Sequence, residues 1–256
     1  MTIPTVVLVS IGIHPASQRP RRAEQDARAV EMGLQLAGDE LHVVHAGNPH
    51  EPALRAYLGM GLAQLQVLEQ PPQADAVPVL RDYLREAGVQ LVLTGNQAET
   101  GEGSGMLPYL LAEQLGWPLV AGVAQIESVH DGVASVLQAL PRGQRRRLAV
   151  RLPFMATVDN TAPSGRQSAY GPATRGEIQA QVVEGVDDQL STTATLSPAK
   201  PRPKRLKVIK AKSGADRMKA ATAKATGGSG RVLSGVSAEE GAQAILTLLI
   251  EEGVVR

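Results

Sequence analysis

The chain has 256 residues, no cysteine, only 2% aromatic residues and a formal net charge of +1. Without cysteine it forms no disulfide, has no catalytic thiolate and binds neither zinc nor an iron–sulfur cluster through cysteine. The small net charge excludes a general attraction to nucleic acid or membrane. No apolar run approaches the roughly 20 residues of a membrane span, and no basic region precedes a signal core, so we expect a soluble cytoplasmic protein.

The first half of the sequence alternates apolar, β-branched runs with amphipathic helical segments. The runs predict strands at Thr5 to Ile13, Leu41 to Ala46, Leu65 to Leu68 and Val89 to Leu93. The three-to-four-residue apolar spacing predicts helices at about Ala23 to Ala37, Glu51 to Met60, Ala74 to Ala87 and Leu107 to Leu115. Strands that alternate with helices predict an α/β fold, a parallel sheet flanked by helices on both faces.

The pattern changes after the fourth helix. Two extended segments, Leu119 to Ser128 and Val133 to Leu140, are joined by a short turn and predict a β-hairpin excursion. Arg145 to Arg151 and Phe154 to Val158 continue without room for helices, and one more strand is expected after the hairpin. The loop from Asp159 to Gly176 is rich in Asn, Pro, Ser and Gly, and a loop of this length often binds something.

The C-terminal part has a different composition. Between Ser191 and Gly235, eleven basic residues are opposed by Asp216 alone, and no apolar periodicity crosses the segment. We expect an extended arm here, followed by an amphipathic helix at Ala238 to Glu251 that docks on this chain or on a partner. The arm lacks aromatic residues for base stacking, so a nucleic-acid partner is not expected. The predicted division is residues 1–185 for the α/β domain and 186–256 for the arm and docking helix.

A glycine-rich loop joins the central strand to the next helix. It carries Gly95, Gly101, Gly103 and Gly105, and such a loop can point several backbone N–H groups at an anion, with Ser104 as a cap or a hydroxyl donor. The spacing matches neither GxxxxGK[ST] nor GxGxxG followed by a ribose-binding acid. From spacing alone, a flexible connection without a ligand remains an equal alternative.

Several motifs together resemble the beta subunit of electron-transferring flavoprotein. They are VVLVS, DARAVEMGLQLA, VVHAG and above all LVLTGNQAETGEGSGMLPYLLAEQLGWP, with LPFMATVDN further on. The resemblance covers about residues 5–180 and implies a Rossmann-like, adenine-nucleotide-binding fold. It also implies an electron carrier rather than an enzyme. The five histidines show no metal-ligand spacing and no catalytic motif is present, so we expect neither a metal nor a catalytic residue in this chain.

The resemblance implies a heterodimer with an electron transfer flavoprotein alpha subunit. FAD is then held together with the alpha subunit, and AMP is a structural ligand of this chain. Electrons pass from a flavin dehydrogenase through FAD to a quinone oxidoreductase. The positions that the resemblance assigns to the AMP pocket are Ser10, Asp26, Ala46, Gly95, Asn96, Gln97, Ala98, Glu99, Thr100, Gly101, Glu102, Gly103 and Ser104.

The same resemblance places a dehydrogenase-recognition loop near Asn160 to Ile178. Its partner-binding positions are Arg166, Ala169, Tyr170 and Pro172. Tyr170 stands where the family has a leucine anchor, so we predict a donor other than the common acyl-CoA type.

Three alternatives remain open from the sequence. A second FAD in the AMP pocket would make the complex a bifurcating flavoprotein. A universal-stress-type regulator shares the sheet topology and also binds an adenine nucleotide. A nucleic-acid-binding protein with a basic tail would bind with a steep dependence on salt.

Overall fold

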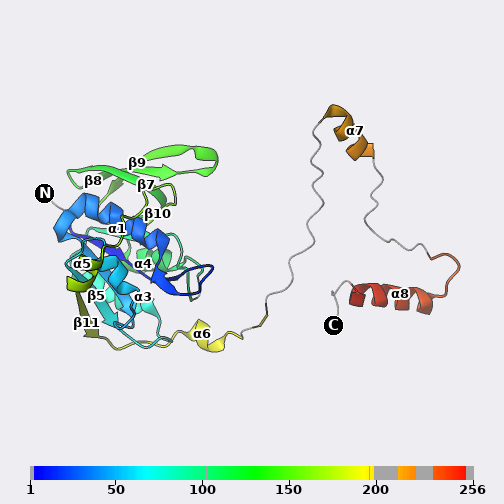
Figure 1. Cartoon of the computed structure of the whole chain (residues 1–256), viewed down its shortest axis with the longest axis horizontal. Coiled ribbons are helices and arrows are strands. Elements are labelled where there is room, and N and C mark those ends of the chain that lie inside the picture. The colour runs from blue at the N-terminus through cyan, green and yellow to red at the C-terminus, as the bar shows by residue number, and fades with distance from the viewer. Residues whose placement is uncertain (1–2, 102, 196, 199–212, 223–232, 252–256) are drawn as a thin grey trace. The chain divides into compact units, whose positions relative to one another are not determined.

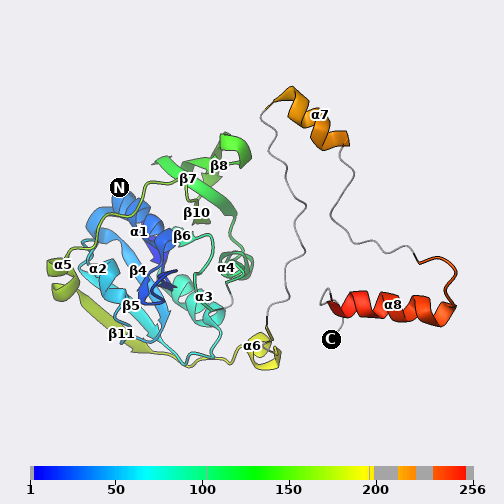
Figure 2. The same cartoon turned by 45° about the vertical axis from the view of Figure 1, so that its right-hand side comes forward.

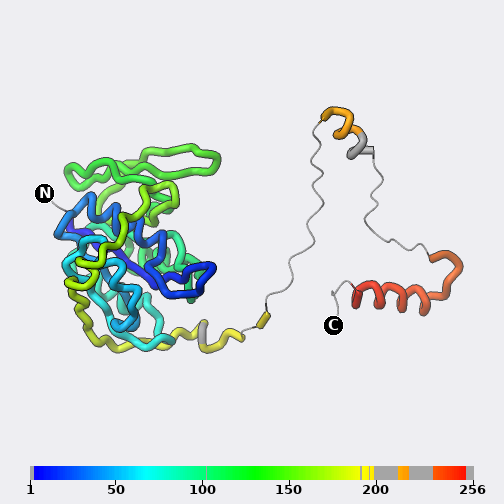
Figure 3. Tube along the Cα trace, viewed as in Figure 1, coloured from blue at the N-terminus to red at the C-terminus, as the bar shows by residue number. Residues whose placement is uncertain are grey.

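The computed structural model describes residues 3–101, 103–195, 197–198, 213–222 and 233–251. The chain divides into two compact units, Met1–Leu196 and Ser197–Arg256. Figure 1 shows the first unit as a sheet with helices packed against it, and the Cα trace in Figure 3 follows the chain through it. The predicted α/β fold class is confirmed.

The first unit is built on a nine-stranded sheet of order β11-β5-β4-β1-β6-β10-β7-β8-β9. The pairs from β11 to β7 are parallel, and those of β8 with β7 and β9 are antiparallel. The strands are β1 Thr5–Leu8, β4 His42–Gly47, β5 Gln64–Glu69, β6 Leu91–Gly95, β7 Leu119–His130, β8 Val133–Ala139, β9 Arg145–Arg151, β10 Phe154–Val158 and β11 Glu177–Val182.

Helices cover both faces of the parallel strands, and Figure 2 shows the two pairs on opposite sides. Helices α1 (Glu24–Ala37) and α2 (Leu54–Leu58) pack on one face, while α3 (Ala76–Glu86) and α4 (Leu107–Leu115) pack on the other. Successive residues of β1 alternate between the two apolar clusters, because side chains of a strand point to opposite faces in turn. Because both faces of these strands are covered by helices, their sequences are continuous apolar runs.

The order of the strands reverses between β1 and β6. The chain adds β4 and β5 on one side of β1 and then crosses through α3 to place β6 on the other side. In open α/β sheets, ligands bind in the crevice outside the carboxyl ends of the strands at such a switch point. The loops that leave β1 and β6 therefore mark the place to look for a site.

The first predicted strand is interrupted. β1 ends at Leu8, and Ile11–Ile13 forms a separate strand, β2, that pairs in antiparallel fashion with β3, Pro20–Arg22. The expectation of one continuous strand from Thr5 to Ile13 was wrong. The polar Ser10 lies at the break, where it turns to the start of α1 instead of extending the sheet.

The hairpin excursion is larger than predicted. β7 and β8 form the hairpin, and β9 adds a third antiparallel strand at the edge of the sheet. Exposed arginines occupy Arg145 to Arg147 on this edge strand. Charged side chains on an edge oppose pairing with other chains, which agrees with the position of β9.

The long loop after β10 contains structure that the sequence did not predict. α5, Tyr170–Arg175, lies within it, and β11 follows and pairs with β5. β11 has the sequence EIQAQV, and its side chains are mostly exposed. A polar edge strand of this kind lacks the apolar run by which the inner strands are recognised.

The described part of the second unit contains α7, Gly214–Thr222, and α8, Ala238–Glu251. α7 was not predicted, and neither was the short α6 of the first unit, Gln189–Thr193. Each helix of the second unit begins with a reciprocal cap, between Ser213 and Asp216 and between Ser237 and Glu240. Most basic residues of the predicted arm lie outside the described residues. Among the described helices, none combines the length and apolar character that a bilayer crossing needs.

Candidate functional site

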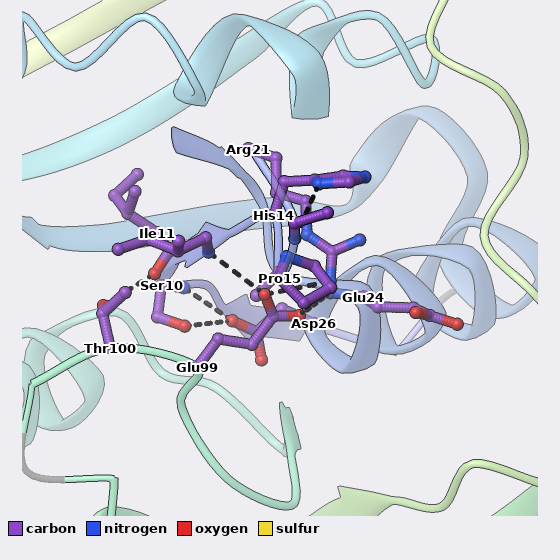
Figure 4. Close-up of polar contacts among 12 residues, drawn as sticks. Ser10, Ile11, His14, Pro15, Arg21, Glu24, Asp26, Glu99 and Thr100 are labelled. Carbon is purple, nitrogen blue, oxygen red and sulfur yellow. Dashed lines mark hydrogen bonds and ion pairs between the residues drawn. The ribbon is translucent and has the colours of Figure 1, made fainter. Parts of the chain in front are cut away.

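Asp26 connects the two strands at the switch point. Its side chain projects from the first turn of α1, where Oδ2 accepts hydrogen bonds from the N–H of Ser10 at 2.7 Å and from its Oγ at 2.6 Å. Oδ1 accepts from the N–H of Gly95 at 3.1 Å. Figure 4 shows Asp26 and Ser10 joined in this way. The structure thus brings together three predicted pocket residues at the carboxyl ends of β1 and β6.

The Asp26 carboxyl is deeply buried, with 5% of the residue exposed. Burial raises its pKa from 3.8 to about 6, although the hydrogen bonds from Ser10 and Gly95 oppose that rise. Desolvation disfavours the charged form, whereas donors aimed at the carboxylate favour it. Asp26 is therefore a buried carboxyl with a raised pKa at the carboxyl ends of β1 and β6.

Asn96 is fixed between α1 and the sheet. Its N–H donates to Oε1 of Gln25 at 2.9 Å, and its Oδ1 accepts from Oγ1 of Thr157 at 2.5 Å. The hydroxyl of Tyr57 donates to the carbonyl of Ser10 at 2.9 Å and accepts from the N–H of Ala23 at 2.8 Å. Asn96 and Ser10 are thus both held by side chains from neighbouring elements.

Glu99 fastens the glycine loop to the β2–β3 ribbon and to α1. Its Oε1 accepts from the N–H of Glu24 at 2.8 Å, and its Oε2 accepts from the N–H of Ile13 at 3.2 Å. Nη2 of Arg21 donates to both oxygens at 3.2 Å. Oγ1 of Thr100 donates to the carbonyl of Ile11 at 2.8 Å. Figure 4 shows Glu99 close to Arg21 and Glu24, and Thr100 beside Ile11.

The glycines give the loop its shape. Gly101, Gly103 and Gly105 have φ of 73°, 60° and 76°, which side chains disfavour, and a Cβ on Gly105 would lie 2.7 Å from the carbonyl oxygen of Asn96. The Gln97 amide donates to the carbonyl of Gly103. No backbone N–H of residues 98–101 or 103–105 donates to another described residue. These donors can serve an anion.

Ser104 caps the turn before α4, because its Oγ accepts from the N–H of Met106 at 3.1 Å. Ala46 lies at the carboxyl end of β4, beside β1, and packs against the α3–α4 apolar cluster. The remaining predicted pocket residue, Glu102, lies outside the described residues. An open groove of about 510 Å³ borders the loop, lined among others by Glu24, Arg28 and Glu99.

Two of the residues predicted to bind a partner, Arg166 and Ala169, contact α1 and the end of α2. Arg166 donates through Nε to Oε2 of Glu31 at 2.7 Å and through Nη2 to Oε1 at 3.0 Å, and its backbone N–H also reaches Oε2 at 3.1 Å. This contact lowers the pKa of Glu31 to about 2. The guanidinium therefore ties the long loop to α1.

The next residues of that loop lie against α2. The N–H of Ala169 donates to the carbonyl of Gly59 at 2.9 Å, and the carbonyl of Pro172 accepts from Gly176 at 2.8 Å. Tyr170, at the start of α5, is 86% exposed. The loop thus presents one large aromatic side chain on a fixed base.

Sequence reasoning missed Gln25, Glu31 and Tyr57. Tyr57 belongs to the apolar side of a short helix, which is typical of a core residue, and its polar role depends on Ser10, 47 positions away. Glu31 is one of many charged residues on α1, a pattern that ordinarily indicates a solvated face. Neither role had a local signal.

Comparison with known proteins gives consistent results. Residues 21–186 match the electron transfer flavoprotein domain family. The chain is 56% identical over 253 residues to electron transfer flavoprotein subunit beta of Chromohalobacter salexigens, covering 98% of this chain and 95% of that one. It is 28% identical over 166 residues to the subunit of the same name from Bacillus subtilis, covering 61% of this chain and 62% of that one.

Proposed function

The chain belongs to the electron transfer flavoprotein family as a beta subunit, and we propose that it works in a heterodimer whose alpha subunit shares a bound FAD with it. FAD supplies the redox chemistry when bound, taking up electrons and passing them on. This chain supplies binding surfaces and a folded support. It is a carrier subunit rather than an enzyme.

We propose that the crevice at the β1–β6 switch point holds AMP. The observation that carries this proposal is the meeting of Asp26, Ser10 and Gly95 beneath a glycine loop whose N–H groups are available to an anion. Those N–H groups and the Ser104 hydroxyl would hold the phosphate. The polar side chains of Asn96 and Gln97 border the same loop and can hydrogen-bond the nucleoside.

The proposed partner surfaces are those where large apolar or aromatic side chains are exposed. α8 exposes Ile245, Leu246, Leu248 and Ile250, an apolar face that needs a cover. We propose that the alpha subunit provides it. Tyr170 on its fixed base is the proposed anchor for a flavin dehydrogenase, and a quinone oxidoreductase is the proposed acceptor.

Copurification tests this function. The tagged full chain is purified from its native cells, and mass spectrometry and the visible spectrum are recorded for the complex. We expect a second subunit, an electron transfer flavoprotein alpha subunit, and a flavin spectrum. A colourless chain that purifies alone would overturn the heterodimer proposal.

The donor contact has its own test. In the heterodimer, Tyr170→Ala should slow flavin reduction by the native dehydrogenase while leaving chemical reduction by dithionite unchanged. Tyr109→Ala on α4 is a suitable control, because Tyr109 is also exposed but belongs to another surface. Equal rates for the two variants would refute the role of Tyr170.

A further inference from the structure

We propose that Glu99 makes the nucleotide pocket selective for a nucleoside monophosphate over nucleotides that carry two or more phosphates. The inference rests on the proposed AMP site, since it concerns the same pocket. Glu99 fills a seat for an anion, defined here as the N–H groups of Ile13 and Glu24 and the guanidinium of Arg21 (Figure 4). The chain itself therefore occupies a place where a further phosphate would bind.

The anion seat has the donors that a phosphate requires. The N–H of Glu24 belongs to the first turn of α1, where backbone donors lack a partner within the helix and the helix dipole adds partial positive charge. Nη2 of Arg21 donates to both oxygens of Glu99, which places the positive charge of the guanidinium beside the carboxylate as it would lie beside a phosphate. Because Glu99 accepts from the N–H groups of Ile13 and Glu24 and from Nη2 of Arg21, a second phosphate would meet a filled seat and a like charge.

The surrounding shape fits the Glu99 carboxylate closely. Gly12 lies beneath it, and a Cβ at that position would come within 2.5 Å of Oε2 and 2.8 Å of the Cα of Ala23. The next residue, Thr100, is bonded to the carbonyl of Ile11. The Glu99 side chain is only 21% exposed. If the Glu99 carboxylate left the anion seat, it would lose all of its hydrogen-bond donors.

The charge of the adjoining groove acts in the same direction. Two carboxylates, those of Glu24 and Glu99, line it, and Arg28 is the cation among its lining residues. Arg28 is already engaged by Glu24 at 3.3 Å and by the carbonyl of Ala162. One phosphate can be held by the N–H groups of the glycine loop that donate to no other described residue, whereas each additional phosphate adds negative charge beside these carboxylates.

A competition experiment tests the inference. The full chain, with any copurified subunit, is equilibrated with equimolar AMP and ADP until the bound ratio is constant, and the retained nucleotides are quantified after denaturation. We expect the wild type to retain mainly AMP. Glu99→Gln keeps the shape but removes the charge, and should lower the AMP:ADP ratio about tenfold, the effect of one partly screened like-charge contact.

Two further variants test whether the charge of Glu99 in the anion seat, and not any negative charge of the groove, sets the AMP:ADP ratio. Glu24→Gln removes a negative charge from the same groove but leaves the Glu99 carboxylate in the anion seat, and should lower the ratio by less than Glu99→Gln. Arg21→Met leaves the Glu99 charge less compensated, and should raise the ratio. This opposite shift keeps the inference testable even if Glu99→Gln folds poorly.

The outcomes are distinguishable. An unchanged ratio in Glu99→Gln, an equal shift in Glu24→Gln or a lower ratio in Arg21→Met would overturn the inference. A wild type that retains AMP and ADP equally would overturn it while leaving the adenine-nucleotide site intact. A wild type that retains neither would overturn the site and the inference together.

Discussion

Replacing Asp26 by Asn tests whether the carboxyl between Ser10 and Gly95 is as poorly solvated as its surroundings indicate. Asp26 is 5% exposed and accepts three hydrogen bonds from Ser10 and Gly95. Asn keeps the size of the side chain and one acceptor oxygen but removes the charge. The lost hydrogen bonds lower the free energy of unfolding by a similar amount at every pH. The effect of the charge is therefore the part of the change that depends on pH.

The magnitude follows from the pKa. Burial raises the pKa of Asp26 from 3.8 to about 6 in the folded protein. A carboxyl that holds its proton more tightly when folded contributes its full stability below pH 3.8 and loses that contribution as the pH rises through 6. The loss is roughly 3 kcal/mol in total, of which about 1.4 kcal/mol falls between pH 5 and pH 8.

Urea unfolding without nucleotide at pH 5 and pH 8 measures this difference. Between the two pH values, the free energy of unfolding of Asp26→Asn should gain about 1.4 kcal/mol relative to the wild type. Asp39→Asn, at an exposed position on η1 (Gly38–Glu40), is the matched control and should follow the wild type. An equal stability difference at both pH values would show that the carboxyl is not desolvated, and would refute the reasoning.

Two other contacts give predictions of stability. Glu31→Gln should lower the free energy of unfolding by about 1 kcal/mol at neutral pH, because Arg166 is half exposed and solvent screens the pair. Since the pKa of Glu31 is lowered to about 2, this difference should shrink as the pH falls from 4.5 toward 2, and a constant difference would argue against the ion pair. Gly12→Ala should cost about 1–3 kcal/mol in thermal or urea unfolding, because its Cβ would collide with Glu99. Gly241→Ala, which has open space around it in α8, should be neutral or slightly stabilising, and equal effects of the two changes would contradict the close packing at Gly12.

The inner part of the fold could be predicted because the physical signal is local. Leu91, Val92 and Leu93 are apolar and fully buried, since a parallel strand is covered on both faces. α1 ends at Ala37, as the apolar spacing predicted, and Gly38 follows with a φ of 57°, which glycine adopts readily. β11 had no such signal, because an exposed edge strand is polar and is recognised only by its partner β5.

The candidate site was only partly predictable. The glycine loop could be identified from its composition, whereas Ser10 and Asp26 were proposed through family resemblance. Their contact joins residues 16 positions apart, and the contact of Glu99 with Ile13 joins residues 86 positions apart. Such pairings depend on the order of the strands, which hydrophobic periodicity does not encode. Glu99 was predicted to contact the nucleotide. Its hydrogen bonds to the β2–β3 ribbon became visible only in the structure.

Hydrogen exchange of the full chain with and without AMP tests the proposed nucleotide site most directly. If AMP binds at the β1–β6 switch point, amides of residues 95–105 and of Ser10 to Ile13 should exchange more slowly when AMP is present, whereas those of α5 should be unchanged. Exchange that is unchanged in both crevice segments, or slowed only elsewhere, would contradict the assignment of this crevice to the nucleotide.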